Sequence, residues 1–512
     1  MNQRWFRALF RRRALVIALL LIQIAFVGML IFTGSQAFQW INVVLRIVSF
    51  LAALYIVSKK DKGAYKTAWI FLILTFPLFG GLMYLLVHSQ ATTRWVAKEI
   101  RRSEEKAAPL YRLPGDGYAQ AEAAIGDRFP QVRYLQNFMG FPIYTHTATT
   151  YYSPGEEMFA ALLPELEKAE HYIFLEFFII HEGVMWDSIL EILKRKAKQG
   201  VTVRLIYDDM GCFLLLPTDY PKQLEQMGIS CVKFNPFRPF LSAIQNNRDH
   251  RKIISIDGKV AFTGGINLAD EYINAIERFG HWKDSAIKVE GEAAWSFTLM
   301  FLQMWDACRR EDEDFSRYYP WQTNPCPVIG DGFVQPYMDS PMDTENVGEH
   351  VYLQILNQAK DYVYIMTPYL ILDNEMITAL EFAAGRGVDV RMILPRAADH
   401  IYASVLAKSH YRELTDAGVK IYEYTPGFIH AKVFLSDDDT AVVGTINLDY
   451  RSLYLHYECA ALLYKVPAIR DIKEDFRDTF EKSHLITQED IKHRPFLTKL
   501  FGVLLKVAAP LM

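Results

Sequence analysis

The stretch NRDHRKIISIDGKVAFTGGIN, residues 247–267, is the first of two copies of one motif. It contains the pattern H-x-K-x-x-x-x-D, formed by His250, Lys252 and Asp257, and it ends at Asn267. The apolar, β-branched residues after Lys252 are typical of a buried strand. Asp257 and the glycine that follows it are typical of a tight hairpin turn. The stretch therefore predicts two neighbouring strands, the first of which begins with a histidine and a lysine.

The second copy lies 180 residues later, in the stretch HAKVFLSDDDTAVVGTIN. Its matching residues are His430, Lys432, Asp437 and Asn447. A single motif of this length can arise by chance in a long chain, whereas two copies in matched order indicate an internal duplication. The chemistry of the motif should therefore be read from both copies together.

Residues i and i+2 of an extended strand point to the same face, so each motif histidine projects beside its lysine. One His–Lys pair on a strand is usually structural, but two such pairs with two asparagine amides suit phosphoryl transfer. Cations and amide donors neutralise the phosphate oxygens, one imidazole attacks phosphorus, and the other protonates the leaving alkoxide. The expected catalytic residues are His250, Lys252, His430 and Lys432, with Asn267 and Asn447 as phosphate ligands.

No metal or cofactor is expected. Protonated lysines are not ordinary metal ligands, and the sequence has no His, Asp, Glu or Cys cluster with metal-ligand spacing. The five cysteines are scattered, which does not indicate a disulfide framework.

The two motifs resemble those of the phospholipase D superfamily, and their flanks resemble its bacterial cardiolipin synthase branch. The matching stretches are NNRDHRKIISIDGKVAFTGGINLADEY, TPYLILDNEMITALEFAAGRGVDVRMILP and GFIHAKVFLSDDDTAVVGTINLDYRSLYLHYE. The resemblance implies phosphatidyl transfer between two phosphatidylglycerol molecules, which yields cardiolipin and glycerol through a phosphohistidine. It also implies His250 as the nucleophile and His430 as the general acid and base. Hydrolysis of the phospholipase D type and transfer to another alcohol remain alternatives.

Each motif has a carboxylate downstream, Asp284 in HWKDS and Glu458 in HYECA. A catalytic histidine often needs an acid on its other ring nitrogen, so both are expected to orient the histidines; a buried salt bridge is the alternative. Asp257 and Asp437 belong to the catalytic motif, but their positions at turns predict a structural role. The nearby polar residues that we expect to act only through others are Glu271, His281, His400 and His456. The chain departs from the superfamily pattern at Lys283 and at Asp339-Ser340-Pro341.

A repeated order of strands and helices predicts the fold. In the first half it is HYIFLEFFII, VMWDSILEILKRKAKQG, VTVRLIYDD and GISCVKF; in the second it is DYVYIMTPYLIL, EMITALEFAAGRG, VDVRMILP and GVKIYEY. Such alternation predicts βαβ units. We therefore expect an α/β protein with two duplicated phospholipase D-like halves, each with a mixed sheet, that share one active-site cleft. The expected segments are 1–90 (membrane), 91–130 (linker), 131–340 and 341–485 (the two halves), and 486–512.

The first 90 residues predict membrane helices. Five arginines precede an apolar run at 14–32, and further apolar segments follow at 40–57 and 67–87. Each is long enough to cross a bilayer at about 1.5 Å per residue. Pro77 and Gly80 favour a kink or close helix packing in the last segment. A multi-pass protein of the cell membrane with two to three spans is expected, because the third segment suits either a span or a re-entrant segment. Flanking lysines and arginines leave the side of the catalytic part open.

The overall charge argues against nucleic acid as a partner, because 55 basic and 59 acidic residues give a net charge of −4. Membrane phospholipid is the expected partner, and a scaffold that binds anionic lipid without turnover is the non-enzymatic alternative. The sequence indicates no oligomeric state. The C-terminal segment has apolar residues at helical spacing beside Lys499 and Lys506, which suits either a bilayer surface or packing on the protein.

Overall fold

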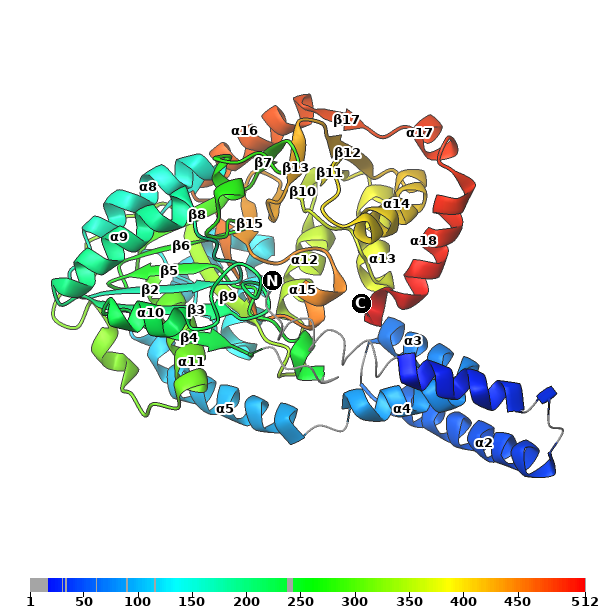
Figure 1. Cartoon of the computed structure of the whole chain (residues 1–512). Helices are drawn as coiled ribbons and strands as arrows, with labels where there is room; N and C mark the ends of the chain where they lie inside the picture. Colours follow the sequence, from blue (N-terminus) through cyan, green and yellow to red (C-terminus); the bar gives the residue numbers. More distant parts are fainter. Residues whose placement is uncertain are drawn as a thin grey trace. The chain divides into compact units, whose positions relative to one another are not determined.

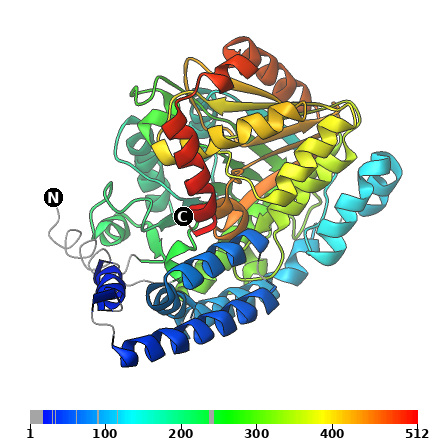
Figure 2. The same cartoon turned by 90° about the vertical axis from the view of Figure 1, so that its right-hand side faces the viewer.

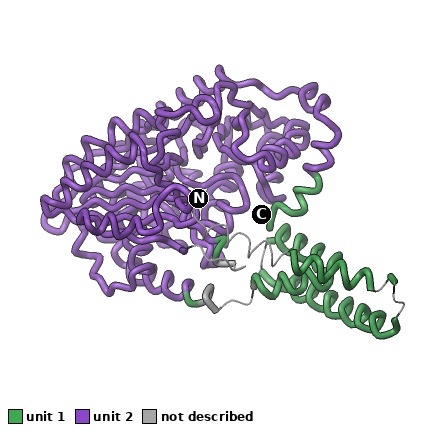
Figure 3. The backbone as a smooth tube through the Cα atoms, in the orientation of Figure 1, with its two compact units in different colours: residues 1–95, 237–246, 503–512 green, residues 96–236, 247–502 purple. Residues whose placement is uncertain are grey.

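The computed structural model describes residues 17–29, 31–32, 35–60, 62–88, 91–114, 117–236 and 243–511. The N-terminal arginine cluster lies outside the described residues. The chain forms two compact units (Figure 3). Unit 1 comprises residues 1–95, 237–246 and 503–512, and unit 2 comprises residues 96–236 and 247–502.

Unit 1 contains the apolar helices α2 (Gln36–Ser58), α3 (Gly63–Thr75) and α4 (Pro77–His88). Among the described residues, α2 is the one helix long and apolar enough to cross a membrane; a shorter apolar helix covers Ile17–Met29. The third expected span is not one helix, because the chain breaks at Phe76 and restarts at Pro77. Proline lacks the N–H that a continuous helix would need there. Three uninterrupted spans are therefore not supported.

Gly80 explains how α3 and α4 pack together. A Cβ atom at Gly80 would lie 2.6 Å from the Leu72 carbonyl oxygen, so a larger residue would push the helices apart. The first N–H groups of α4, those of Leu78 and Phe79, both donate to Gln23 Oε1 at 3.1 Å. Trp69 and Tyr84 then meet edge to face, with ring centroids 5.2 Å apart. The glycine thus has the packing role that the sequence predicts.

Unit 2 contains two mixed sheets with the same strand order. The first sheet is ordered β1-β8-β6-β5-β2-β3-β4. Its strands are β1 (Thr147–Tyr152), β2 (Tyr172–Phe177), β3 (Thr202–Asp208), β4 (Ser230–Phe234), β5 (Ile253–Ile256), β6 (Val260–Gly264) and β8 (Ala286–Gly291). Strands β2, β3 and β4 are parallel neighbours, and the other pairs are antiparallel.

The second sheet repeats this plan with one extra edge strand, in the order β17-β12-β11-β10-β14-β15-β16-β9. Its strands are β9 (Phe333–Asp339), β10 (Tyr362–Met366), β11 (Asp389–Pro395), β12 (Lys420–Tyr424), β14 (Val433–Ser436), β15 (Thr440–Gly444), β16 (Glu458–Tyr464) and β17 (Ser483–Leu485). The predicted duplication of α/β halves with mixed sheets is confirmed.

The two sheets share one apolar layer and carry helices on their other faces (Figure 1). The shared layer contains Ile253 and Ala261 from the first sheet and Val433 and Val443 from the second. The outer helices are α8 (Gly155–Glu167), α9 (Val184–Lys198), α12 (Val347–Gln358) and α13 (Asn374–Gly385). Facing sheets bring the two motif hairpins, β5–β6 and β14–β15, toward each other.

Two segments lie elsewhere than the sequence indicated. The boundary expected at residue 340 follows β9, yet β9 pairs with β16 of the second sheet along its whole length. The expected linker 91–130 includes α5 (Ala91–Ala107) and α6 (Tyr118–Ile125). Ala121 and Ile125 of α6 are buried in the core of the second half. The many polar residues of these helices indicated a linker, although one face of α6 is buried.

Candidate active site

The motif histidines lie on extended segments directly before the strands. Strand β5 begins at Ile253 and β14 at Val433, one residue after Lys252 and Lys432 respectively. Both histidine side chains are almost buried, with exposed fractions of 8% for His250 and 9% for His430. The strands thus anchor the motif, while the histidines and lysines stand just beyond their ends.

The motif segment of each half is bonded to the backbone of the other half. The His250 N–H donates to the Tyr457 carbonyl at 3.0 Å, and the His430 N–H donates to the Lys283 carbonyl at 2.7 Å. Tyr457 and Lys283 directly precede the two acids of the site. Each histidine is therefore positioned against the acid-bearing segment of the opposite half.

The side chains follow the same crossed arrangement. His250 Nδ1 lies 2.9 and 3.0 Å from the two carboxylate oxygens of Glu458. His430 Nδ1 lies 2.7 Å from Asp284 Oδ2. Both carboxylates are fully buried. A carboxylate on Nδ1 fixes the ring and leaves Nε2 for chemistry, as the sequence-based role of Asp284 and Glu458 requires.

The two acids are held by different neighbours. Asp284 fits only because residue 265 is glycine, where a Cβ atom would lie 2.0 Å from Asp284 Oδ1. At the matching position in the second half, the Thr445 hydroxyl donates to Glu458. The shorter Asp is thus paired with a glycine, and the longer Glu with a hydrogen-bond donor.

The two motif lysines are buried beside the histidines. Lys252 Nζ donates to the His250 carbonyl at 2.7 Å. Lys432 Nζ lies 2.8 Å from His430 Nδ1. That nitrogen cannot donate to Asp284 and accept from Lys432 at once, and the ionised carboxylate favours the contact with Asp284. Two ammonium groups in one buried site provide a field suited to a phosphate group.

The two asparagines differ in their contacts. Asn267 Oδ1 accepts from the Ile179 N–H at 3.0 Å, and Asn267 Nδ2 donates to the Tyr272 hydroxyl at 2.8 Å. An amide nitrogen has two hydrogens, so one remains for a ligand. Asn447 is also buried, and its Oδ1 has no hydrogen-bond partner among the described residues.

Burial and positive charge keep both histidines neutral. Burial, with added repulsion from Lys252, lowers the pKa of His250 well below its usual value. Burial and Lys432 lower the pKa of His430 to about 4, although Asp284 opposes the change. The charge of His430 also contributes to the shift at His250, so the two motifs share one site. A neutral imidazole has the free lone pair that a nucleophile needs.

The acids and lysines have shifted pKa values as well. Burial lowers the pKa of Lys252 to about 8 and that of Lys432 to about 7. Burial alone would raise the pKa of Asp284, but the charges of His430 and Lys432 lower it overall. Burial raises the pKa of Glu458 well above its usual value. The two His–acid pairs are therefore electrostatically unequal, with the ionised carboxylate beside His430.

Asp257 and Asp437 lie at the other end of the hairpins, away from the reactive nitrogens. Asp257 accepts from the backbone N–H groups of residues 170–172 at 2.7–2.8 Å. Asp437 accepts from those of residues 360–362 at 2.8–2.9 Å and also pairs with Arg128. Their positive φ angles, 52° and 50°, suit the hairpin turns. Although both belong to the motif, their contacts are those of structural residues.

Several neighbours of the site were not foreseen as such. The rings of Tyr272 and Trp282 lie 5.4 Å from that of His430, and the ring of Phe178 lies 5.2 Å from that of His250. No motif in the sequence connects these single aromatic residues with the catalytic histidines. Of the other polar residues, Glu271 binds Arg278 and His281 lies 3.0 Å from the Tyr424 hydroxyl.

His456 is closer to the chemistry than its position in the sequence indicated. Its ring lies 5.5 Å from that of His250, and neither ring nitrogen has a hydrogen-bond partner among the described residues. His250, His456 and Glu458 form a group whose ligand atoms lie within 4.8 Å of one another. Spacing in the sequence did not indicate this metal-capable geometry, since it joins separate segments. The surrounding lysines and arginines disfavour a cation there.

Comparisons with known proteins identify the family of the chain. The family described as "Cardiolipin synthase, PLD-like domain" matches residues 162–295 and 352–480, and "Phospholipase D-nuclease N-terminal" matches residues 47–87. A cardiolipin synthase of Geobacillus kaustophilus is 33% identical over 90% of this chain and 91% of its own. An uncharacterized protein of Streptococcus mutans is 48% identical over 90% of this chain and 99% of its own.

A solved structure shows the same fold. The phosphatidylserine synthase of Haemophilus influenzae superposes with a TM-score of 0.55 at 14% identity, over 75% of this chain and 98% of its own. The duplicated sheets, the crossed His–acid pairs and the two family matches all point to one assignment. The chain belongs to the cardiolipin synthase family of the phospholipase D superfamily.

Proposed function

We propose that this chain is a cardiolipin synthase that transfers a phosphatidyl group between two phosphatidylglycerol molecules and releases glycerol. The observation that carries the proposal is the pair of crossed contacts, His250 with Glu458 and His430 with Asp284, beside two buried lysines. Those groups provide a nucleophile, a proton donor and a field for phosphate without a metal. Family membership selects the lipid substrate among the phosphodiesters that such a site could cleave.

In the first step, Nε2 of His250 attacks phosphorus, and the bond from phosphorus to the glycerol headgroup oxygen breaks. A proton from His430 passes to that oxygen, so glycerol leaves neutral. The negative charge of a bound phosphate raises the pKa of His430 from its low value in the empty site, which favours its protonated form. The result is a phosphatidyl group on His250 and a neutral imidazole at His430.

In the second step, His430 takes the proton from a headgroup hydroxyl of a second phosphatidylglycerol. The hydroxyl oxygen attacks phosphorus, the bond from phosphorus to His250 breaks, and cardiolipin forms. Water in place of that hydroxyl would give hydrolysis, and another alcohol would give another phosphatidyl lipid. The difference between the two acids supports His430 as the general acid and base. Its partner, the ionised Asp284, stabilises the protonated imidazole that His430 forms in each cycle.

Lys252, Lys432, Asn267 and Asn447 are proposed to bind the phosphate oxygens. Asp257 and Asp437 support the motif by holding its hairpins. No metal or cofactor enters either step. The charge that a metal would supply comes from the two lysines.

We also propose that unit 1 is a multi-pass membrane anchor. Helix α2 has the length and composition of a span. Helices α3 and α4, folded on each other at Pro77, suit a re-entrant hairpin in the bilayer. The proposed segments are the membrane part to about residue 90, a connecting segment to 130 whose helix α6 packs in the core of the second half, the two halves with β9 in the second, and the C-terminal amphipathic segment.

The test is to incubate the purified full-length protein with phosphatidylglycerol that carries labels in the phosphate and in the headgroup glycerol. Cardiolipin with an equal amount of free glycerol is the expected product. Phosphatidic acid alone would identify a hydrolase, and a new lipid formed only with an added alcohol would identify a different acceptor. A protein that binds the lipid and releases neither product would be a scaffold.

A further inference from the structure

The C-terminal helix α18 (Phe496–Ala508) presents large apolar side chains to the outside. The exposed fractions are 75% for Phe496 and Leu497, 47% for Leu500 and 57% for Phe501. These residues recur at helical spacing and therefore form one stripe. A contiguous exposed stripe of this size marks a surface that contacts another apolar phase.

The part of α18 up to Gly502 belongs to unit 2 and packs there on a neighbouring helix. Gly502 is buried, and a Cβ atom there would lie 3.1 Å from Ser409 Cβ on helix α14 (Ile401–Asp416). Arg494, just before α18, donates to the Lys408 carbonyl at 2.6 Å. Figure 2 shows α18 in red beside α14 in yellow. The stripe is thus fixed in direction by packing on α14.

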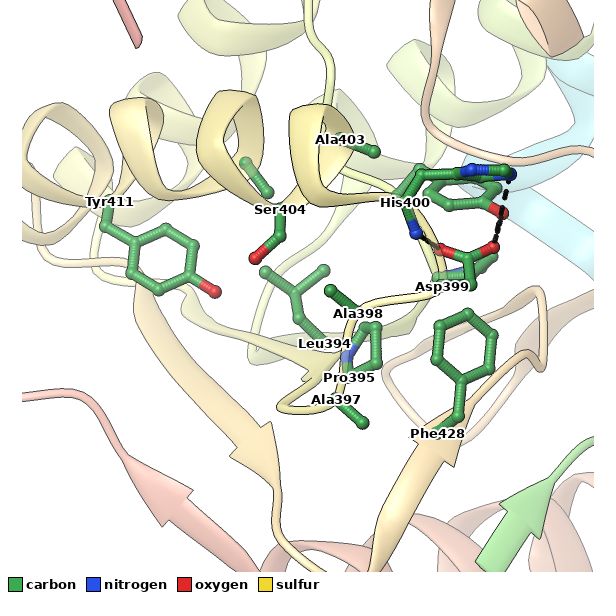
Figure 4. Close-up of a pocket in the computed structure, with 13 residues that line it drawn as sticks. Leu394, Pro395, Ala397, Ala398, Asp399, His400, Ala403, Ser404, Tyr411 and Phe428 are labelled. Atoms are coloured by element: carbon green, nitrogen blue, oxygen red, sulfur yellow. Dashed lines mark hydrogen bonds and ion pairs between the residues drawn. The ribbon is translucent and has the colours of Figure 1, made fainter. Parts of the chain in front are cut away.

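Helix α14 has exposed apolar residues of its own and lines a small pocket. Its first turn exposes Ile401 (80%) and Tyr402 (40%). Its inner side, with Ala403, Ser404 and Tyr411, lines a pocket whose opposite side includes Phe428 (Figure 4). The Phe428 ring lies 6.1 Å from that of His430. One helix therefore has an exposed apolar end and an inner side that lines a small pocket together with Phe428, a neighbour of His430.

The charge around the stripe selects a kind of partner. Residues 491–512 include Lys492, Arg494, Lys499 and Lys506 but no Asp or Glu. An apolar stripe whose own helix carries basic but no acidic groups suits an anionic lipid surface, where apolar burial and attraction to headgroups add. A second copy of the same segment would instead bring like charges together.

The chain continues directly from α18 into unit 1. Leu511, a few residues after α18, packs within unit 1 against the cluster of Ile56, Trp69, Ile73 and Tyr84. The stripe is therefore joined by a short segment of chain to the proposed membrane anchor.

We infer that the stripe of α18, together with the first turn of α14, lies in the interfacial layer of an anionic bilayer. This contact does not depend on the proposed function. Its use rests on the proposed function, because an enzyme held at the bilayer surface meets its lipid substrate there.

Photo-cross-linking of the full-length protein in vesicles tests the contact without turnover. The probe is phosphatidylglycerol with a diazirine in the acyl chain, at a few per cent in vesicles of phosphatidylglycerol or of phosphatidylcholine. After tryptic digestion, label is expected on residues 493–499 and 500–506, and more in phosphatidylglycerol vesicles. The control is Phe382 of α13, which is 59% exposed but outside the stripe. Equal label at Phe382, no label on α18, or cross-links from α18 to a second copy would each overturn the inference.

A second measurement uses activity. The double variant Leu497→Ser with Phe501→Ser should lower turnover on vesicles about tenfold and leave turnover on detergent-dispersed substrate unchanged, since it removes two exposed apolar side chains that insert into the bilayer interface. Phe382→Ser, the matched control, should leave both unchanged. An equal loss on both substrates would indicate damage to the fold, and the inference would then fail at this test. An inactive wild-type protein would contradict the proposed function but not the cross-linking result.

Discussion

The backbone N–H of His430 donates to the carbonyl of Lys283 at 2.7 Å, across the boundary between the two halves. His250 makes the equivalent bond to Tyr457. Because the next residues are Asp284 and Glu458, these bonds fix the distance from each histidine to its acid. Neither half can position its own histidine, so the site exists only when both halves are folded together.

The crossed pairs predict that the two acids act on different steps. Asp284→Asn should impair proton transfer by His430, whereas Glu458→Gln should impair attack by His250. Both should lower kcat by about 10²–10⁴-fold on phosphatidylglycerol. A substrate with a good leaving group needs no proton donor, so it should restore the first step in Asp284→Asn but not in Glu458→Gln. Burst kinetics measure that step, and equal rescue of both variants would contradict the division of roles.

Gly265 gives a steric prediction. In Gly265→Ala the new methyl group would meet Asp284 Oδ1 at 2.0 Å and the His430 carbonyl at 2.9 Å. Asp284 must move, so we expect a fall in kcat/KM of about 100-fold or more, because small displacements of catalytic groups are costly. The control is Gly385→Ala in α13, where a Cβ atom meets nothing within 4 Å. Normal activity in Gly265→Ala would show that Asp284 tolerates displacement.

The sequence was sufficient to predict the duplication and the motif residues that the structure brings together, for a physical reason. Motif residues at fixed spacing, such as His250 and Lys252, are set by local strand geometry, which the sequence encodes directly. The roles of Asp284 and Glu458 followed from their chemistry. Their crossed partners did not follow, because the packing of one sheet on the other decides which histidine each acid meets.

Long-range packing also explains the other differences. Strand β9 pairs with β16, more than 110 residues later, so its sheet could not be assigned from local pattern. His456 lies near the site because of the turn before β16, which its sequence neighbours do not indicate. The break at Pro77 could be anticipated, since proline acts locally, but the fold of α4 onto α3 depends on the contact of Gly80 with Leu72.

The lysine pKa values predict a fall in activity at alkaline pH. Lys252, with a pKa of about 8, and Lys432, with a pKa of about 7, are protonated below these values and lose charge as the pH rises through them. Phosphate binding needs the charge, so kcat/KM, which reports the free enzyme, should decline above about pH 7–8. Arginine stays charged throughout, so Lys432→Arg should flatten the decline even if its absolute rate is lower. A decline of the same form in that variant would assign the titration to another group.

Asp437 predicts an effect on stability rather than on chemistry. Asp437→Asn would weaken bonds to three backbone N–H groups and leave Arg128, 5% exposed, with Asp439 at 3.3 Å but without its nearer charge partner. We expect a loss of about 2–4 kcal/mol in the free energy of unfolding, seen as a lower Tm, with kcat of the folded protein nearly unchanged. The control is Asp438→Asn, whose side chain is 60% exposed and should change Tm little. A large fall in kcat with an unchanged Tm would return Asp437 to the catalytic group.

The surroundings of the two histidines predict which of them is the nucleophile. Both histidines are neutral and buried, but His430 faces the ionised Asp284, which suits proton transfer, and so His250 is expected to carry the covalent phosphate. With labelled phosphatidylglycerol and a quench that avoids acid, acid-labile label should appear on the peptide that contains His250. His430→Ala should accumulate this species when the substrate has a good leaving group, because attack proceeds while activation of the second alcohol fails. His250→Ala, the matched control, should show no label on either peptide. Label on His430 in the wild-type protein would exchange the two roles and leave the two-histidine mechanism intact.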